Sequence, residues 1–142
     1  MVVENQTSQQ IKKDILAPIR PDMNRLNEVV RTTLHSEVPL VNQVAEYLIN
    51  AGGKRLRPAI HLLLTRALQA QCPDTAYTLA AVVEFIHTST LLHDDVVDES
   101  DLRRGRQTAN ALFGNAASVL VGDFLYSRSF QMMVSVQSMR VM

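Results

Sequence analysis

"EFIHTSTLLHDDVVDESDLRRG", residues 84–105, is the stretch that decides the fold. Its apolar residues have helical spacing up to an acidic cluster, where five carboxylates fall between residues 94 and 101. Asp94 and Asp98 are four residues apart, so a helix places both on one face, and such like charges destabilise a helix by roughly 0.2–0.5 kcal/mol. They also lie toward the C-terminus of this helix, where its dipole disfavours negative charge.

A divalent cation would reverse this repulsion. Carboxylate oxygens with no sulfur nearby suit Mg²⁺, which keeps some of its waters and often bridges to a substrate phosphate. The alternative is a solvated acidic helix end that pairs with Arg103 and Arg104. The spacing of Asp94 and Asp98 alone leaves both interpretations open.

The rest of the chain also has helical patterning, so we expect an all-α fold of the bundle kind. Residues 1–20 are polar and are expected to be loosely ordered, and residues 21–142 are expected to form one helical domain. Prolines and glycines mark most of the boundaries, with Asp74 or Thr75 as the cap of the longest helix and Gly52–Gly53 ending the second. The expected helices are 21–36, 39–51, 58–70, 74–100, a short one within 108–115, and 116–139, with a break at 102–107.

The composition of the chain narrows the range of possible functions. The net charge of the 142 residues is zero, so no overall basic field recruits nucleic acid. The single Cys72 excludes an internal disulfide and suits a reducing cytoplasm. The start of the chain lacks the apolar core of a signal peptide, and Glu84 and Asp123 interrupt the longest apolar runs. These features predict a cytoplasmic protein without a membrane span or anchor.

A second charged cluster is "GGKRLRP", residues 52–58, which lies at the expected junction of two helices. Backbone N–H groups at a helix start attract anions, and Lys54, Arg55 and Arg57 add charge and donors. A diphosphate suits this combination, and a solvated basic turn is the alternative. His87 lies two helical turns before Asp94 on roughly the same face, so it is either a phosphate donor or a core histidine with satisfied hydrogen bonds.

Together with "GNAASVLVGDFLYSRSF", residues 114–130, these motifs resemble the N-terminal half of the trans-polyprenyl diphosphate synthases, most closely the bacterial octaprenyl diphosphate synthases. The resemblance implies the all-α isoprenoid synthase bundle, usually as a homodimer. It also implies a Mg²⁺-dependent prenyltransferase that adds isopentenyl diphosphate repeatedly to an allylic diphosphate such as farnesyl diphosphate.

The resemblance also implies roles for individual residues. Asp94, Asp95 and Asp98 would be the catalytic aspartates, with Asp94 and Asp98 as the Mg²⁺ ligands and Asp95 less directly at the metal. The residues that would hold the isopentenyl diphosphate are Lys54, Arg57, His87 and Arg104, and Arg103 would contact the allylic diphosphate.

Ser89 and Thr90 bear on the length of the product. Short-chain relatives place a bulky aromatic near this point, whereas Ser89 and Thr90 are small and would leave the floor of the tunnel open. A long product, of the kind used for quinone side chains, is therefore expected. Close packing between helices explains the same small residues equally well.

The family has about twice this length and carries a second aspartate-rich motif, which these 142 residues lack. We therefore expect about half an active site, negligible activity of this polypeptide alone, and apolar helix faces that promote association.

Two rival functions are left open. A metal-dependent phosphohydrolase of the HD type could use His61, His93–Asp94 and Asp123, but it leaves the basic cluster without a role. A non-enzymatic helical interaction module needs no site at all. A terpene cyclase shares the aspartate motif but has no second diphosphate to bind.

Overall fold

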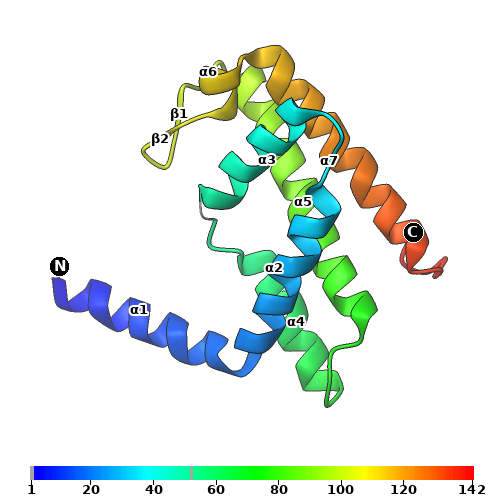
Figure 1. Cartoon of the computed structure of the whole chain (residues 1–142). Coiled ribbons are helices and arrows are strands. Elements are labelled where there is room, and N and C mark those ends of the chain that lie inside the picture. Colours follow the sequence, from blue (N-terminus) through cyan, green and yellow to red (C-terminus); the bar gives the residue numbers. More distant parts are fainter. Residues whose placement is uncertain (1, 52) are drawn as a thin grey trace.

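The computed structural model describes residues 2–51 and 53–142, and side chains from residue 7 onward. Most of this chain is helical, as predicted (Figure 1). The elements are α1 (Val2–Leu16), a 3₁₀ turn η1 (Ala17–Ile19), α2 (Arg20–Leu34), α3 (Pro39–Asn50), α4 (Leu56–Leu68), α5 (Asp74–Val97), β1 (Leu102–Arg103), β2 (Arg106–Gln107), α6 (Ala109–Phe113) and α7 (Asn115–Ser135).

Helix α5 lies at the centre of the bundle and packs against α7, α4 and α2 (Figure 1). Its buried face includes Ala76, Ala80 and Ala81, with Phe85 and Leu92 as the large apolar side chains. Small residues let neighbouring helices approach closely, and the core is completed by Leu26 of α2, Leu62 of α4 and Leu125 of α7. The charged end of α5 is thus held by a packed core on several sides.

Helices α5 and α7 touch through small polar residues. The Ser89 hydroxyl donates to the Gly122 carbonyl at 2.8 Å, and the Ser118 hydroxyl donates to the Leu92 carbonyl at 3.2 Å. A β-carbon on Gly122 would lie 2.3 Å from Nε2 of His93, so only glycine leaves room for this ring. His93 is therefore a packing residue between the two helices.

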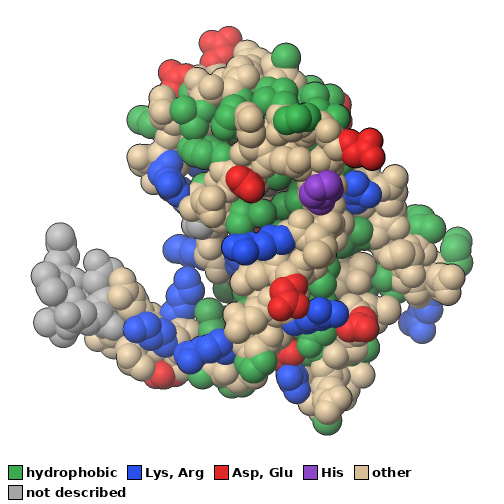
Figure 2. Space-filling view, viewed as in Figure 1, with side chains coloured by type: hydrophobic (Ala, Val, Ile, Leu, Met, Phe, Trp, Pro, Cys, Tyr) green, Lys and Arg blue, Asp and Glu red, His purple; other side chains and the backbone are tan. Residues whose placement is uncertain are grey.

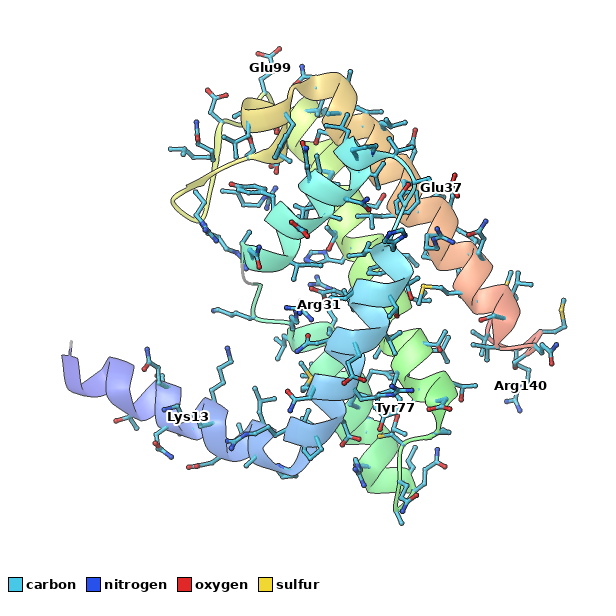
Figure 3. The ribbon with its side chains drawn as sticks, viewed as in Figure 1. Lys13, Arg31, Glu37, Tyr77, Glu99 and Arg140 are labelled. Carbon is cyan, nitrogen blue, oxygen red and sulfur yellow. The ribbon has the colours of Figure 1, made fainter. Side chains whose placement is uncertain are left out.

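A buried ion pair joins α2, α4 and α5 away from the charged end. The Asp22 carboxylate is 2% exposed and accepts hydrogen bonds from Arg66 Nε at 2.9 Å and from the Tyr77 hydroxyl at 2.7 Å. Tyr77 lies beside α2 in Figure 3. Burial alone would raise the pKa of Asp22, but these hydrogen bonds outweigh it and lower the pKa. The bond to Asp22 and burial raise the pKa of Tyr77 to about 12.

Several helix ends differ from the expected ones. Helix α4 starts at Leu56, so Pro58 falls within its first turn, and α7 ends at Ser135. The expected cap of α5 was wrong, because Asp74 is its first helical residue, Pro73 precedes it, and no side chain caps the end. Helix α3 ends at Asn50, and Gly52 lies outside the described residues.

The first 20 residues include a helix where the sequence indicated a loosely ordered segment. Helix α1 projects away from the bundle in Figure 1, and Ile11 and Ile15 are more than half exposed on it. The division of the chain at residue 20 remains a prediction. Within the described residues, no helix combines the length and apolar character needed to cross a membrane.

Candidate functional site

A cavity of about 400 Å³ lies between the last turn of α3, the loop that follows it, the middle of α5 and the β1–β2 hairpin. Lys and Arg side chains gather on this side of the molecule, below the hairpin in Figure 2. Glu84 and Asp95 are the acidic residues of the lining. The lining also contains six basic residues: Lys54, Arg55, Arg57, Arg103, Arg104 and Arg106. The cavity is therefore strongly positive within a chain of zero net charge.

The loop after α3 is fixed through Arg55. This residue has left-handed backbone angles, φ 45° and ψ 37°, and it immediately precedes α4. Its guanidinium donates to the side-chain oxygen of Asn27 on α2. Arg55 is half-buried, whereas Lys54 and Arg57 on either side of it are exposed at the cavity. Anchoring Arg55 therefore leaves its two basic neighbours available to an anion.

The three aspartates at the C-terminal end of α5 separate into two groups, with Asp94 and Asp95 in the last turn and Asp98 as the residue that follows the helix. Asp95 is 5% exposed and forms a forked ion pair with Arg103, with Nη2 at 2.7 Å and Nε at 3.1 Å from Oδ1. The hydrogen bond to Asp95 raises the pKa of Arg103. Asp94 and Asp98 are exposed, and neither forms an ion pair within residues 7–51 and 53–142. Two carboxylates thus face solvent from one side of the helix, while the third holds an arginine.

No group of three or more His, Cys, Asp or Glu residues that could hold a metal occurs among the described residues. Asp94 and Asp98 can therefore supply only part of a coordination sphere. Mg²⁺ commonly takes one or two carboxylates and completes its shell with waters and substrate phosphates, so the two residues fit such a site.

The hairpin presents three arginines to the cavity, Arg103, Arg104 and Arg106. Arg104 and Gly105 form its turn, with φ values of 52° and 75°. A two-residue hairpin turn with both central residues at positive φ is of type I′, and glycine suits its second position. Arg104 is exposed at this turn, and Arg103 lies beside it in β1.

His87 lines the cavity one helical turn from Leu91. Burial lowers its pKa, and the positive charge of Arg57, followed by those of Arg104 and Arg103, lowers it further. An imidazole with a pKa below 6.5 is neutral at pH 7 and can still donate one N–H hydrogen bond to an anion.

Ser89 and Thr90 do not line the cavity. Ser89 is 1% exposed and lies in the contact between α5 and α7, where its hydroxyl bonds to Gly122. Thr90 is exposed, and its hydroxyl donates to the His87 carbonyl at 2.7 Å. Close helix packing thus accounts for Ser89, and the role of both residues in product length stays a prediction.

Tyr47 and Arg106 are cavity residues that the sequence analysis missed. The Tyr47 hydroxyl donates to the Gln107 carbonyl at 2.5 Å, and Arg106 donates to the Asn50 carbonyl at 3.0 Å. The partners are 60 and 56 residues apart in sequence, so no local pattern joins them. The nearest local indication was the third arginine that follows "RRG".

The four residues of the phosphohydrolase alternative do not form one metal-binding group within the described part of the chain. His93 lies 3.3 Å from Asp123, but Asp94 is exposed without an ion pair in the described chain. His61 is on α4, and its Nε2 atom is buried without a hydrogen-bond partner among the described residues. These positions give that alternative no support.

An all-α bundle with a cationic cavity beside paired aspartates defines the class of protein. The profile of the family described as "Polyprenyl synthetase" matches residues 38–142 of this chain. The chain therefore belongs to the polyprenyl synthetase family.

Curated relatives agree with this assignment. The chain is 56% identical over 121 residues to the octaprenyl diphosphate synthase of Escherichia coli K12, an alignment that covers 85% of this chain and 37% of the relative. It is 47% identical over 128 residues to the all-trans-nonaprenyl-diphosphate synthase of Rhodobacter capsulatus, covering 90% of this chain and 39% of the relative. The chain thus spans little more than a third of the length of these relatives, rather than the half expected from the sequence.

Solved structures confirm the isoprenoid synthase fold. A decaprenyl diphosphate synthase from Rhodobacter capsulatus superposes with a TM-score of 0.86 at 49% identity, over 91% of this chain and 40% of that one. A polyprenyl synthase from Caulobacter crescentus, complexed with calcium and isoprenyl diphosphate, gives a TM-score of 0.82 at 46% identity, over 91% and 39%.

Proposed function

We infer that this chain supplies the isopentenyl diphosphate site and the first aspartate-rich motif of a long-chain trans-polyprenyl diphosphate synthase. The enzyme adds isopentenyl diphosphate to an allylic diphosphate such as farnesyl diphosphate. The observation that carries the proposal is the convergence of six Lys and Arg side chains on one cavity beside the exposed Asp94 and Asp98.

The basic residues and the aspartates of the candidate site receive individual roles under this proposal. Lys54, Arg57 and Arg104 bind the isopentenyl diphosphate as cations, and neutral His87 donates a hydrogen bond to it. Arg103 contacts the allylic diphosphate while its other edge stays on Asp95. Asp94 and Asp98 are the metal ligands, and Asp95 positions Arg103.

The reaction breaks the allylic C–O bond, and the departing diphosphate carries the bonding electrons. The double bond of isopentenyl diphosphate attacks the resulting allylic cation, and loss of a proton gives a new allylic diphosphate. Mg²⁺, when bound, stabilises negative charge on the leaving diphosphate. Arginines of this chain add to that stabilisation, and the apolar interior of the bundle excludes water from the cation.

Several finer features follow from the same proposal. The product is a long all-trans chain for a quinone side chain, and Ser89 and Thr90 border its tunnel. The enzyme acts in the cytoplasm as a homodimer. The names of the similar octaprenyl and decaprenyl synthases support the product class.

Calorimetric titration of isopentenyl diphosphate into the 142-residue chain tests the cavity directly. We expect saturable binding that is lost in Lys54→Ala/Arg57→Ala, because both cations reach the same anion. Arg25→Ala removes an exposed arginine of α2 that pairs with Glu28, and it serves as the matched control with unchanged binding. Equal binding by the double variant and the wild type would overturn the proposed site.

Turnover of this polypeptide alone should be negligible with both diphosphates and Mg²⁺, because its 142 residues carry one aspartate-rich motif. Normal turnover in a steady-state assay would show that the second motif is dispensable.

A further inference from the structure

The β1–β2 hairpin carries three of the cavity's cations but is too short to hold its own shape. Each strand contributes two residues, with Leu102 opposite Gln107 and Arg103 opposite Arg106. A two-stranded hairpin is marginally stable in water even when it is longer. Arg104 adds a further cost, because a non-glycine residue at φ 52° is uncommon. Contacts from outside must therefore fix the hairpin over the cavity.

These outside contacts come from both sides. On the β1 side, Arg103 is tied to the buried Asp95 of α5. On the β2 side, the Tyr47 hydroxyl donates to the Gln107 carbonyl at 2.5 Å, and Arg106 donates to the Asn50 carbonyl at 3.0 Å.

Helix α3 is well suited to be the anchor. Asn50 is its last residue, so its carbonyl has no partner within the helix, and a cation is favourable at this end of the dipole. The Tyr47 ring meets Phe113 edge-on, with centroids 5.8 Å apart, so the ring is held while its hydroxyl reaches β2. Figure 1 shows the hairpin beside this end of α3.

The last turn of α3 thus serves both basic parts of the cavity. The loop with Lys54 and Arg57 continues directly from it along the chain. The hairpin with Arg104 docks on it through Tyr47 and Arg106. The distance between the two sets of cations depends on these two contacts.

We propose that Tyr47 is a positioning residue, which holds the hairpin through Gln107 so that Arg104 faces the diphosphate bound by Lys54 and Arg57. Arg106 is the second clamp of the same hairpin. This inference rests on the proposed diphosphate site and deepens it.

The three tyrosines of the chain provide a matched set of variants. Tyr47→Phe removes the hairpin contact and keeps the ring. Tyr77→Phe removes a hydroxyl from the buried Asp22 pair, away from the cavity. Tyr126→Phe keeps the ring contact with Phe130, and no hydrogen bond to its hydroxyl occurs among the described residues.

Two measurements separate these variants: the Kd for isopentenyl diphosphate with Mg²⁺, and urea unfolding. We expect Tyr47→Phe to raise the Kd by about two- to tenfold, which corresponds to the loss of one neutral hydrogen bond. The free energy of unfolding should change little. Tyr77→Phe should lower stability and leave the Kd unchanged. Tyr126→Phe should change neither. An unchanged Kd in Tyr47→Phe, with binding by the wild type, overturns this inference alone.

A double-mutant cycle tests whether Tyr47 acts through Arg104. In an Arg104→Ala background, Tyr47→Phe should have no further effect on the Kd, because the group that it positions is gone. Fully additive effects would overturn the proposed route. If the wild-type chain binds no isopentenyl diphosphate, the proposed function fails and this inference fails with it.

Hydrogen exchange gives a readout that needs no ligand. The Thr108 amide donates to the Asp101 carbonyl at 2.9 Å and closes the base of the hairpin. Tyr47→Phe should speed exchange of this amide, while Tyr77→Phe and Tyr126→Phe should not. Unchanged exchange would show that Tyr47 does not hold the hairpin.

Discussion

At the scale of single residues, His61 and His87 are both held in their neutral forms. Burial lowers the pKa of each below the usual value of about 6.5, and Arg57 contributes at His87. The unfolded chain, whose histidines have ordinary pKa values, therefore takes up protons first as the pH falls through 6.5. Folding stability is fully present above that pH and decreases below it.

Urea unfolding at pH 7.5 and pH 5.5 measures this effect. We expect a lower free energy of unfolding at pH 5.5, and a smaller difference in His61→Gln, which cannot take up the proton. If His61→Gln shows the same pH dependence of stability as the wild type, His61 does not contribute to that dependence.

Asp22 is the residue whose loss should destabilise the fold most clearly. Asp22→Asn removes a carboxylate that accepts hydrogen bonds from both Arg66 and Tyr77. We therefore expect the free energy of unfolding in urea to fall by about 1–3 kcal/mol. The matched control is Asp14→Asn on α1, where the carboxylate is exposed and should change stability little.

Charge and spacing in the sequence predicted part of the site. The acidic cluster, the basic loop and His87 were predicted from charge and helical spacing, and Lys54, Arg57 and His87 do share one cavity. Spacing alone could not show that Asp95 pairs with Arg103, because that ion pair depends on the turn of the hairpin. Tyr47 was missed because its partner comes from a distant part of the chain.

At the scale of elements, α5 and α7 approach so closely that Gly122 and His93 depend on one another. Gly122→Ala gains up to about 1 kcal/mol of helix propensity, but its β-carbon would meet the His93 ring at 2.3 Å. We expect the substitution to destabilise the wild-type chain and to stabilise a His93→Ala chain. Urea unfolding of the wild type, the two single variants and the double variant measures this, and the same sign in both backgrounds would contradict the packing described.

Sequence patterns located the elements with unequal success. Apolar periodicity with prolines predicted α2, α3, α4, α5 and α7 to within a few residues, because each buries one face. The hairpin was expected only as a break, since two residues per strand show no alternation. Helix α1 was not expected, because a polar sequence with little buried surface lacks the amphipathic pattern.

At the scale of the whole molecule, the bundle exposes apolar stripes. The stripe on α4 consists of Leu56, Ile60, Leu64 and Leu68, spaced every four residues and each at least 47% exposed. Helix α7 exposes Leu120, Phe130 and Val134. Exposed apolar surface of this extent promotes association.

Sedimentation velocity should therefore show self-association of the 142-residue chain. Leu64→Lys should reduce it, because a charge then interrupts the α4 stripe. Gln71→Lys adds the same charge in the loop beyond α4 and should leave it unchanged. A wild-type chain that sediments as a monomer at all concentrations would contradict this expectation.

Because several cations line the cavity, the free energy of unfolding should depend on the anions in the buffer. Mutual repulsion among Lys54, Arg57 and Arg104 opposes the folded state, and a multivalent anion that binds only this state relieves the repulsion. Such an anion at 100 times its Kd adds about 2.7 kcal/mol to the unfolding free energy. The melting temperature of the chain should therefore rise by about 5–11 °C when inorganic diphosphate at 100 times its Kd replaces chloride at equal ionic strength.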